Sequence, residues 1–99
     1  MTSSSEAFEK FSIWKRSKTP LKVTSYQNGV LMETLRGYVL KTDATEEIVG
    51  VLYEGERYAS FDLEGAVFSV EPCRVVATRS KADWVIFEES LDMRTRSVQ

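Results

Sequence analysis

The sequence changes its periodicity at Thr19-Pro20, and this change restricts the folds that the chain can adopt. Before it, Phe8, Phe11 and Trp14 recur every three residues, a spacing that places them on one stripe of a helix. The residue before a proline is forced out of the helical region, so the helix must end there. After it, short β-forming stretches alternate with turn residues, and no second helical pattern follows. The pattern predicts a mainly β protein with one N-terminal helix.

The expected helix covers about residues 4–16. Ser3, Ser4 or Ser5 can cap its first turn, and the negative charge of Glu6 there is favourable for the helix dipole. We expect the aromatic stripe to dock on the core. The alternative is a platform on which nucleic-acid bases stack.

Two residue signals shape the β region. Asn28-Gly29 predicts a type I′ hairpin turn, and Gly37 lies in the middle of a long stretch, where it predicts a sharp bend or a bulge. Such a strand can serve both halves of a small barrel. The strands are expected at residues 21–27, 30–42, 48–54, 57–63, 66–70, 74–79 and 84–89.

Strands at this spacing indicate a single domain, a small and strongly bent antiparallel barrel. The barrel covers about residues 20–79, an additional strand covers residues 84–89, and residues 90–99 form a loose tail. Ala59, Phe61 and Leu63 are expected on one face of the fourth strand, with Tyr58, Ser60 and Asp62 on the other.

The composition excludes several kinds of enzyme site. The 99 residues include no histidine and one cysteine, so His-based nucleophile activation, His-ligated zinc and intrachain disulfides are all impossible. The single thiol, Cys73, follows a proline, and we expect it to be a small buried or half-buried hydrophobe. The acid pairs Glu46-Glu47 and Glu88-Glu89 are expected to be solvated. We therefore expect a non-enzymatic protein with no catalytic residue, cofactor, metal or small-molecule substrate.

No targeting or membrane segment is readable in the sequence. The first fifteen residues contain Glu6, Glu9 and Lys10, where a signal peptide needs an apolar core. No apolar run approaches the ~18 residues of a membrane span. With one free thiol, the chain is expected to be cytoplasmic and to have no membrane partner.

Charge is unevenly distributed along the chain. Residues 1–22 hold five cations against two acids, a net charge of +3, whereas residues 23–71 hold three cations against nine acids, a net charge of −6. The cations of the first segment cluster at Lys15, Arg16, Lys18 and Lys22. This asymmetry indicates either a basic docking end on an acidic body or simply a solvated surface.

A helix followed by strongly bent strands, the second long and interrupted by glycine, resembles the Sm-like (SH3-like) fold. Within residues 6–78, four stretches are similar to Sm-like proteins, including the Hfq-type RNA chaperones. They are the helix-to-strand junction Lys18-Thr19-Pro20-Leu21, the hairpin Asn28-Gly29, the Sm1-like Gly37-Tyr38-Val39 with Asp43, and the Sm2-like residues 66–70 with 74–76.

The resemblance implies an RNA-binding homo-oligomer, a ring in which residues 66–70 of one subunit pair with residues 74–79 of the next. The RNA-binding residues would be Lys15, Arg16, Lys18, Lys41 and Asp43. The subunit interface would include Phe68, Val70, Val75 and Ala77. Residues 84–89 could instead pair with one of these edges inside the same subunit, which would block or rebuild the ring.

The sequence departs from the family at its RNA-binding positions. Phe68-Ser69-Val70 stand where the Hfq-type proteins carry Tyr-Lys-His, and Glu71-Pro72-Cys73 stand where other Sm proteins carry Arg-Gly. Ala44 and Thr45 offer no aromatic face to a base. Tyr26, Tyr53 and Tyr58 could stack bases, although we expect them to pack across strands. The RNA site would be divergent, and the alternative is a protein-interaction or assembly module with no nucleic-acid role.

Overall fold

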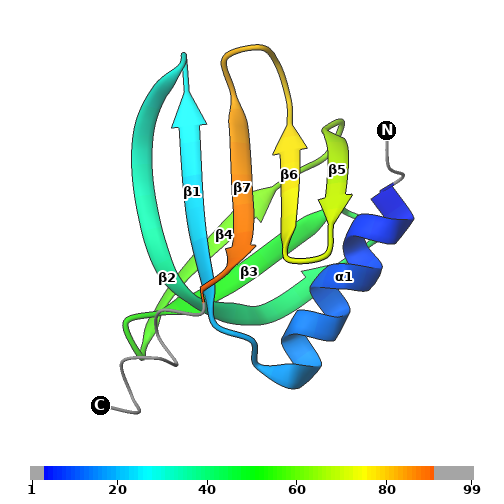
Figure 1. The fold of residues 1–99 in the computed structure, drawn as a ribbon, viewed down its shortest axis with the longest axis vertical. Helices are drawn as coiled ribbons and strands as arrows, with labels where there is room; N and C mark the ends of the chain where they lie inside the picture. The colour runs from blue at the N-terminus through cyan, green and yellow to red at the C-terminus, as the bar shows by residue number, and fades with distance from the viewer. Residues whose placement is uncertain (1–3, 91–99) are drawn as a thin grey trace.

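The computed structural model describes residues 4–90 of the chain. Within this range one helix precedes seven strands, and every neighbouring pair of strands is antiparallel (Figure 1). The sheet is open, with the strand order β4-β3-β2-β1-β7-β6-β5. The elements are α1 (Ser4–Ser17), β1 (Leu21–Gln27), β2 (Val30–Asp43), β3 (Ile48–Tyr53), β4 (Arg57–Asp62), β5 (Val67–Glu71), β6 (Arg74–Thr78) and β7 (Trp84–Glu89). The predicted mainly β fold with an N-terminal helix is confirmed.

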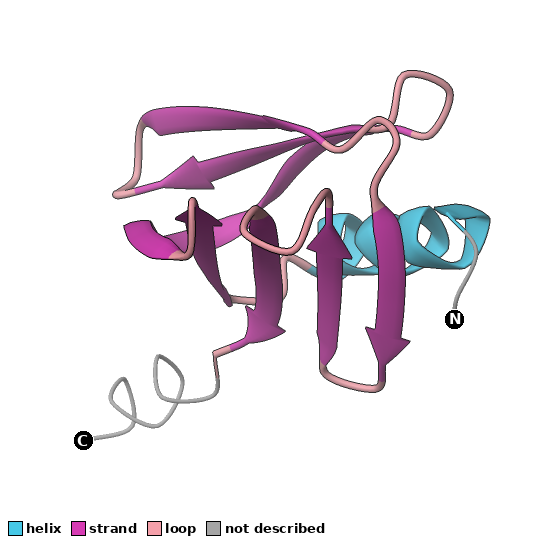
Figure 2. Cartoon of the chain, turned by 90° about the horizontal axis from the view of Figure 1, so that it is seen from above, coloured by secondary structure: helices cyan, strands magenta, loops and turns pink. Residues whose placement is uncertain are grey.

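The sheet folds over on itself because β2 belongs to both of its halves. Residues 30–37 of β2 pair with β1, and residues 37–43 pair with β3, so Gly37 is the position at which the strand changes partner. A Cβ atom at Gly37 would lie 2.0 Å from the carbonyl oxygen of Leu52, a distance that only glycine permits. Figures 1 and 2 show the resulting arrangement, with β3 and β4 crossing behind β1, β7 and β6. The prediction that this strand serves two halves of the fold is confirmed, with the change of partner at Gly37, whereas the irregularity in the β2–β3 register lies between Val39 and Lys41.

The β1–β2 hairpin turn has the predicted geometry. Asn28 and Gly29 both have positive φ, 54° and 74°, as a type I′ turn requires. The turn is also anchored on the β6–β7 loop. The amide of Gly29 donates to the carbonyl oxygen of Ala82 at 2.8 Å, and the amide of Asn28 donates to Oδ1 of Asp83 at 2.9 Å. The two loops therefore form one connected end of the molecule.

The aromatic stripe of α1 packs into the core. Phe8, Phe11 and Trp14 are buried, and the rings of Phe8 and Phe11 contact Phe68 and Phe87 edge-on at centroid distances of 5.9 and 4.9 Å. The indole Nε1 of Trp14 donates to a carboxylate oxygen of Glu89 at 3.0 Å. The expected core-docking face is confirmed, and these rings are not available for stacking on bases.

The C-terminus of α1 is closed by a Schellman motif. The amide of Thr19 donates to the carbonyl of Trp14 at 3.2 Å, and that of Lys18 donates to the carbonyl of Lys15 at 3.4 Å. Lys18 has a φ of 52°, the left-handed conformation that glycine usually provides at this position. A lysine there carries a conformational cost.

Lys18→Gly is therefore expected to leave the fold unchanged and to stabilise it by about 1 kcal/mol, since glycine has no Cβ to oppose the left-handed conformation. Urea unfolding followed by circular dichroism measures the change. Lys15→Gly, at a helical position of the same turn, is the control and is expected to destabilise by about 1 kcal/mol. A loss of stability in Lys18→Gly would contradict the motif.

The strand of residues 84–89 is an interior strand. β7 pairs with β1 on one side and with β6 on the other, and β6 in turn pairs with β5. A ring contact through residues 74–79 would therefore find both sides of β6 occupied within the chain. β4 and β5 are the outer strands of the described sheet.

The residues expected at a subunit interface lie in or against the core of this chain. Phe68, Val75 and Ala77 are buried, and Val70 packs against the core cluster. Their side chains thus stabilise the subunit itself, and a ring contact stays a prediction. Ser90, expected in the loose tail, is buried and donates its amide to the carbonyl of Pro20 at 2.9 Å. Residues 91–99 lie outside the described range.

Candidate functional site

The cations predicted to bind RNA lie together at the C-terminal end of α1. Lys15, Arg16 and Lys18 are all exposed, and within residues 4–90 none of them forms an ion pair. Their charge is favourable next to the carbonyl end of the helix dipole, which is a structural role in itself. The three side chains nevertheless remain available to an anion.

The other two predicted RNA-binding residues lie elsewhere on the chain. Lys41 is exposed on β2, opposite Gly50 of β3. Asp43 ends β2, and its Oδ1 accepts hydrogen bonds from the amides of Thr45 and Glu46, both at 3.0 Å. Asp43 thus holds the β2–β3 loop in shape, and within the described residues it makes no ion pair with the cations of α1.

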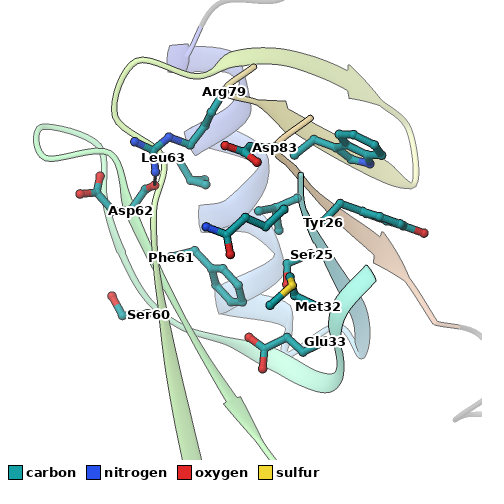
Figure 3. Close-up of a pocket in the computed structure, with 13 residues that line it drawn as sticks. Ser25, Tyr26, Met32, Glu33, Ser60, Phe61, Asp62, Leu63, Arg79 and Asp83 are labelled. Carbon is teal, nitrogen blue, oxygen red and sulfur yellow. Dashed lines mark hydrogen bonds between the residues drawn. The ribbon is translucent and has the colours of Figure 1, made fainter. Parts of the chain in front are cut away.

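A groove that sequence reasoning did not find is lined by residues next to the β1–β2 turn and the β6–β7 loop (Figure 3). These two connections lie at the end of the molecule opposite the C-terminal end of α1 (Figure 1). Its volume is about 540 Å³, within the range of ligand-binding pockets. Its lining comes from β1, β2, β4 and the residue after it, the β6–β7 loop and the start of β7: Ser25, Tyr26, Gln27, Met32, Glu33, Ser60, Phe61, Asp62, Leu63, Arg79, Asp83, Trp84 and Val85.

The groove exists because the sheet extends beyond the core. The inward positions of β1 are apolar and buried at Leu21 and Val23, but polar and more exposed at Ser25 and Gln27. On β2, buried Leu35 is followed towards the hairpin turn by exposed Glu33. Inward polar residues on paired strands are the sequence signal that could have indicated this groove.

One wall of the groove is the open side of β4. The amide of Leu63 donates to the carbonyl of Glu47 at 2.8 Å, which makes Ile48–Asp62 a non-hydrogen-bonded pair of the β3–β4 ladder. Because pairs alternate and the register has no shift, the backbone groups of Ser60 and Asp62 point away from β3. Figure 3 shows the side chains of both residues directed away from the groove, so their backbone lines it.

The floor of the groove is apolar and its rim is charged. Phe61, partly buried, faces into it, as expected from the alternation along β4. Glu33 and Asp83 lie on the wall opposite β4, and the guanidinium of Arg79 donates to the carbonyl of Asp62 at 3.5 Å. Two carboxylates against one cation already engaged by the protein favour a cationic ligand over a polyanion.

The tyrosines considered for base stacking differ in their surroundings. Tyr26 stacks on Trp84 with a centroid distance of 4.7 Å and an interplanar angle of 17°, and Tyr53 packs against the core cluster. Tyr58 covers Gly50 and is 49% exposed. Tyr26 and Tyr53 therefore have the packing role that the sequence predicts.

Cys73 and the Glu71–Arg74 pair lie at the β5–β6 turn. Cys73 is exposed in the β5–β6 turn, which corrects the prediction of a buried or half-buried thiol: a two-residue turn offers no core to cover it. The hydrogen bond and charge of Glu71 raise the pKa of Arg74, so its guanidinium stays charged. Among residues 4–90, no three cysteine or acidic side chains gather as metal ligands, and no helix is long and apolar enough to cross a membrane.

Comparison of the chain with protein-family models, with curated proteins and with solved structures found no match.

Proposed function

We propose that this chain is a non-enzymatic Sm-like protein that binds single-stranded RNA at the basic end of α1. The observation that supports the proposal is the group of three exposed cations, Lys15, Arg16 and Lys18, on one helix end, with no ion pair within the described residues. The bent open sheet behind an N-terminal helix is compatible with the Sm-like resemblance.

The chemistry of this end favours phosphate contacts over base contacts. The aromatic residues of α1 are buried, so the basic end has cations but no ring on which a base could stack. Binding would therefore be insensitive to base identity and strongly dependent on salt. The acidic residues of the β region oppose a polyanion, which keeps the affinity modest.

The test compares two double variants that change the net charge equally. Lys15→Ala with Arg16→Ala is expected to weaken binding of labelled oligo-U and oligo-A alike at low salt. It should also reduce the slope of log Kd against log salt by about 1.4, since each phosphate contact on a single strand contributes about 0.7. Fluorescence polarisation over a salt series measures both quantities.

Arg57→Ala with Lys81→Ala is the matched control. Arg57 forms an exposed pair with Glu54 at 3.6 Å, and Lys81 is exposed in the β6–β7 loop. This control is expected to leave the slope unchanged. No binding at tens of micromolar protein, or equal slopes for the two double variants, would remove support for the RNA function.

The second candidate function is an assembly or protein-interaction module. It is favoured by the two outer strands of the open sheet, β4 and β5, because outer strands can pair with other chains. A ring of the Sm type would have to use these two strands, since β6 has neighbours on both sides. Light scattering distinguishes an oligomer from the 11.3 kDa monomer, and a monomer at all concentrations would exclude the ring.

A further inference from the structure

The open side of β4 offers a short run of backbone hydrogen-bonding groups. Tyr58, Ser60 and Asp62 direct their N–H and C=O groups away from β3, as the register of the β3–β4 ladder requires. Within residues 4–90, Arg79 reaches the carbonyl of Asp62, whereas the outward groups of Ser60 have no protein partner. An extended chain could form two to three main-chain hydrogen bonds here.

The outer edge of β4 faces an opposing wall across the groove. β4 forms one wall, and the connected β1–β2 turn and β6–β7 loop stand opposite it (Figure 3). A second copy of this chain would bring a strand with its own neighbours, which the opposite wall would obstruct. A single extended segment brings no neighbours. The shape therefore favours a peptide over a second subunit.

The side chains that line the groove determine which peptide can bind there. An alkyl chain can lie on Phe61, and Glu33 and Asp83 can receive a cation at its end. Glu33 has no ion-pair partner within the described residues, and Asp83 uses Oδ1 for the amide of Asn28. Lysine and arginine side chains combine an apolar stem with a cationic head.

We propose that the groove binds an extended peptide segment of a partner protein, which adds as a strand to β4 and directs a lysine or arginine side chain towards Glu33 and Asp83. This site is at the opposite end of the molecule from the basic end of α1. It is independent of the proposed RNA binding, and the failure of either proposal leaves the other standing.

The test uses the full chain labelled with ¹⁵N and the peptide acetyl-Thr-Val-Lys-Val-Thr-amide. Binding is expected to shift the amide signals of Ser60, Asp62 and Glu33. The same peptide with glutamate in place of lysine should bind about fivefold more weakly, the upper end of the effect of one exposed charge pair. A peptide that is N-methylated at alternate amides should not bind, because it cannot form the strand hydrogen bonds.

Variants test the charge contact and the main-chain hydrogen bonds separately. Glu33→Gln should reduce the preference for the lysine peptide over the glutamate peptide, because only Asp83 then remains to receive the cation. Glu56→Gln, at an exposed acid in the β3–β4 turn, should retain the full preference. Ser60→Pro should retain the fold, since the amide it removes points away from β3, and should lose peptide binding. The N-methylated peptide tests the same hydrogen bonds with the protein unchanged.

Three outcomes would overturn the proposal. The first is the absence of shifts along β4 at millimolar lysine peptide, and the second is equal binding of the lysine and glutamate peptides. The third is light scattering that shows an oligomer together with protection of the β4 amides before peptide is added, which would assign β4 to a second copy of the chain.

Discussion

Gly37→Ala is expected to lower the melting temperature of the protein by about 12–24 °C, or to prevent folding. The added Cβ would lie 2.0 Å from the carbonyl oxygen of Leu52 and 2.9 Å from the Cα of Tyr53, and both atoms belong to the backbone of β3. The obstacle cannot rotate away, so β2 and β3 must separate where β2 changes partner. We expect a loss of about 3 kcal/mol, and 1 kcal/mol corresponds to about 4–8 °C in a domain of this size. Thermal unfolding followed by circular dichroism measures it.

Gly50→Ala provides the matched control. A Cβ at Gly50 would meet the ring of Tyr58, but that side chain is 49% exposed and can rotate into solvent. Neither Gly37 nor Gly50 has a positive φ, so the two substitutions differ mainly in the kind of obstacle. We expect Gly50→Ala to cost less than about 1 kcal/mol. Equal losses in the two variants would contradict the assigned role of Gly37.

Phe11→Ala is expected to destabilise the fold by about 3–5 kcal/mol, a large fraction of the stability of a domain of this size. Phe11 is fully buried, and its ring contacts those of Phe8, Trp14 and Phe87 at centroid distances of 5.1, 6.0 and 4.9 Å. Truncation would leave a cavity where α1 meets the sheet. Urea unfolding followed by circular dichroism measures the loss.

Ile13→Ala, two residues further along α1, is the control. Ile13 is 43% exposed, so its loss removes little buried surface, and alanine is the better helix former. We expect a change within about 0.5 kcal/mol. If Ile13→Ala destabilised the fold as much as Phe11→Ala, the helix would not dock through its aromatic stripe.

Much of the fold was predictable because its signals are local. The spacing of Phe8, Phe11 and Trp14 predicts both the helix and its buried face, and Asn28-Gly29 predicts the turn that the structure contains. Gly37 predicts a discontinuity in a long strand, and the structure explains it by the close approach of the β3 backbone. These features depend on residues that are neighbours in the sequence.

The candidate sites were predictable only in part. The cluster of Lys15, Arg16 and Lys18 is visible in the sequence because its members lie on one turn of the helix. The resemblance predicts an RNA-binding role for Asp43, and the structure adds a local one that the sequence did not indicate, because its carboxylate accepts the amides of its own loop. The groove was missed because Glu33, Phe61 and Asp83 come from three distant stretches of the chain.

The basic and acidic segments, the single helix and the strand positions follow from the sequence alone, because hydrophobic spacing and turn residues act over a few positions. Which strands become neighbours is a property of the tertiary structure. The sequence left open whether residues 84–89 would pair inside the subunit, and in the fold they lie between β1 and β6. In this strand order β4 is an outer strand, and it lies beside the groove. An open sheet always ends at two outer strands, and long-range pairing decides which strands these are.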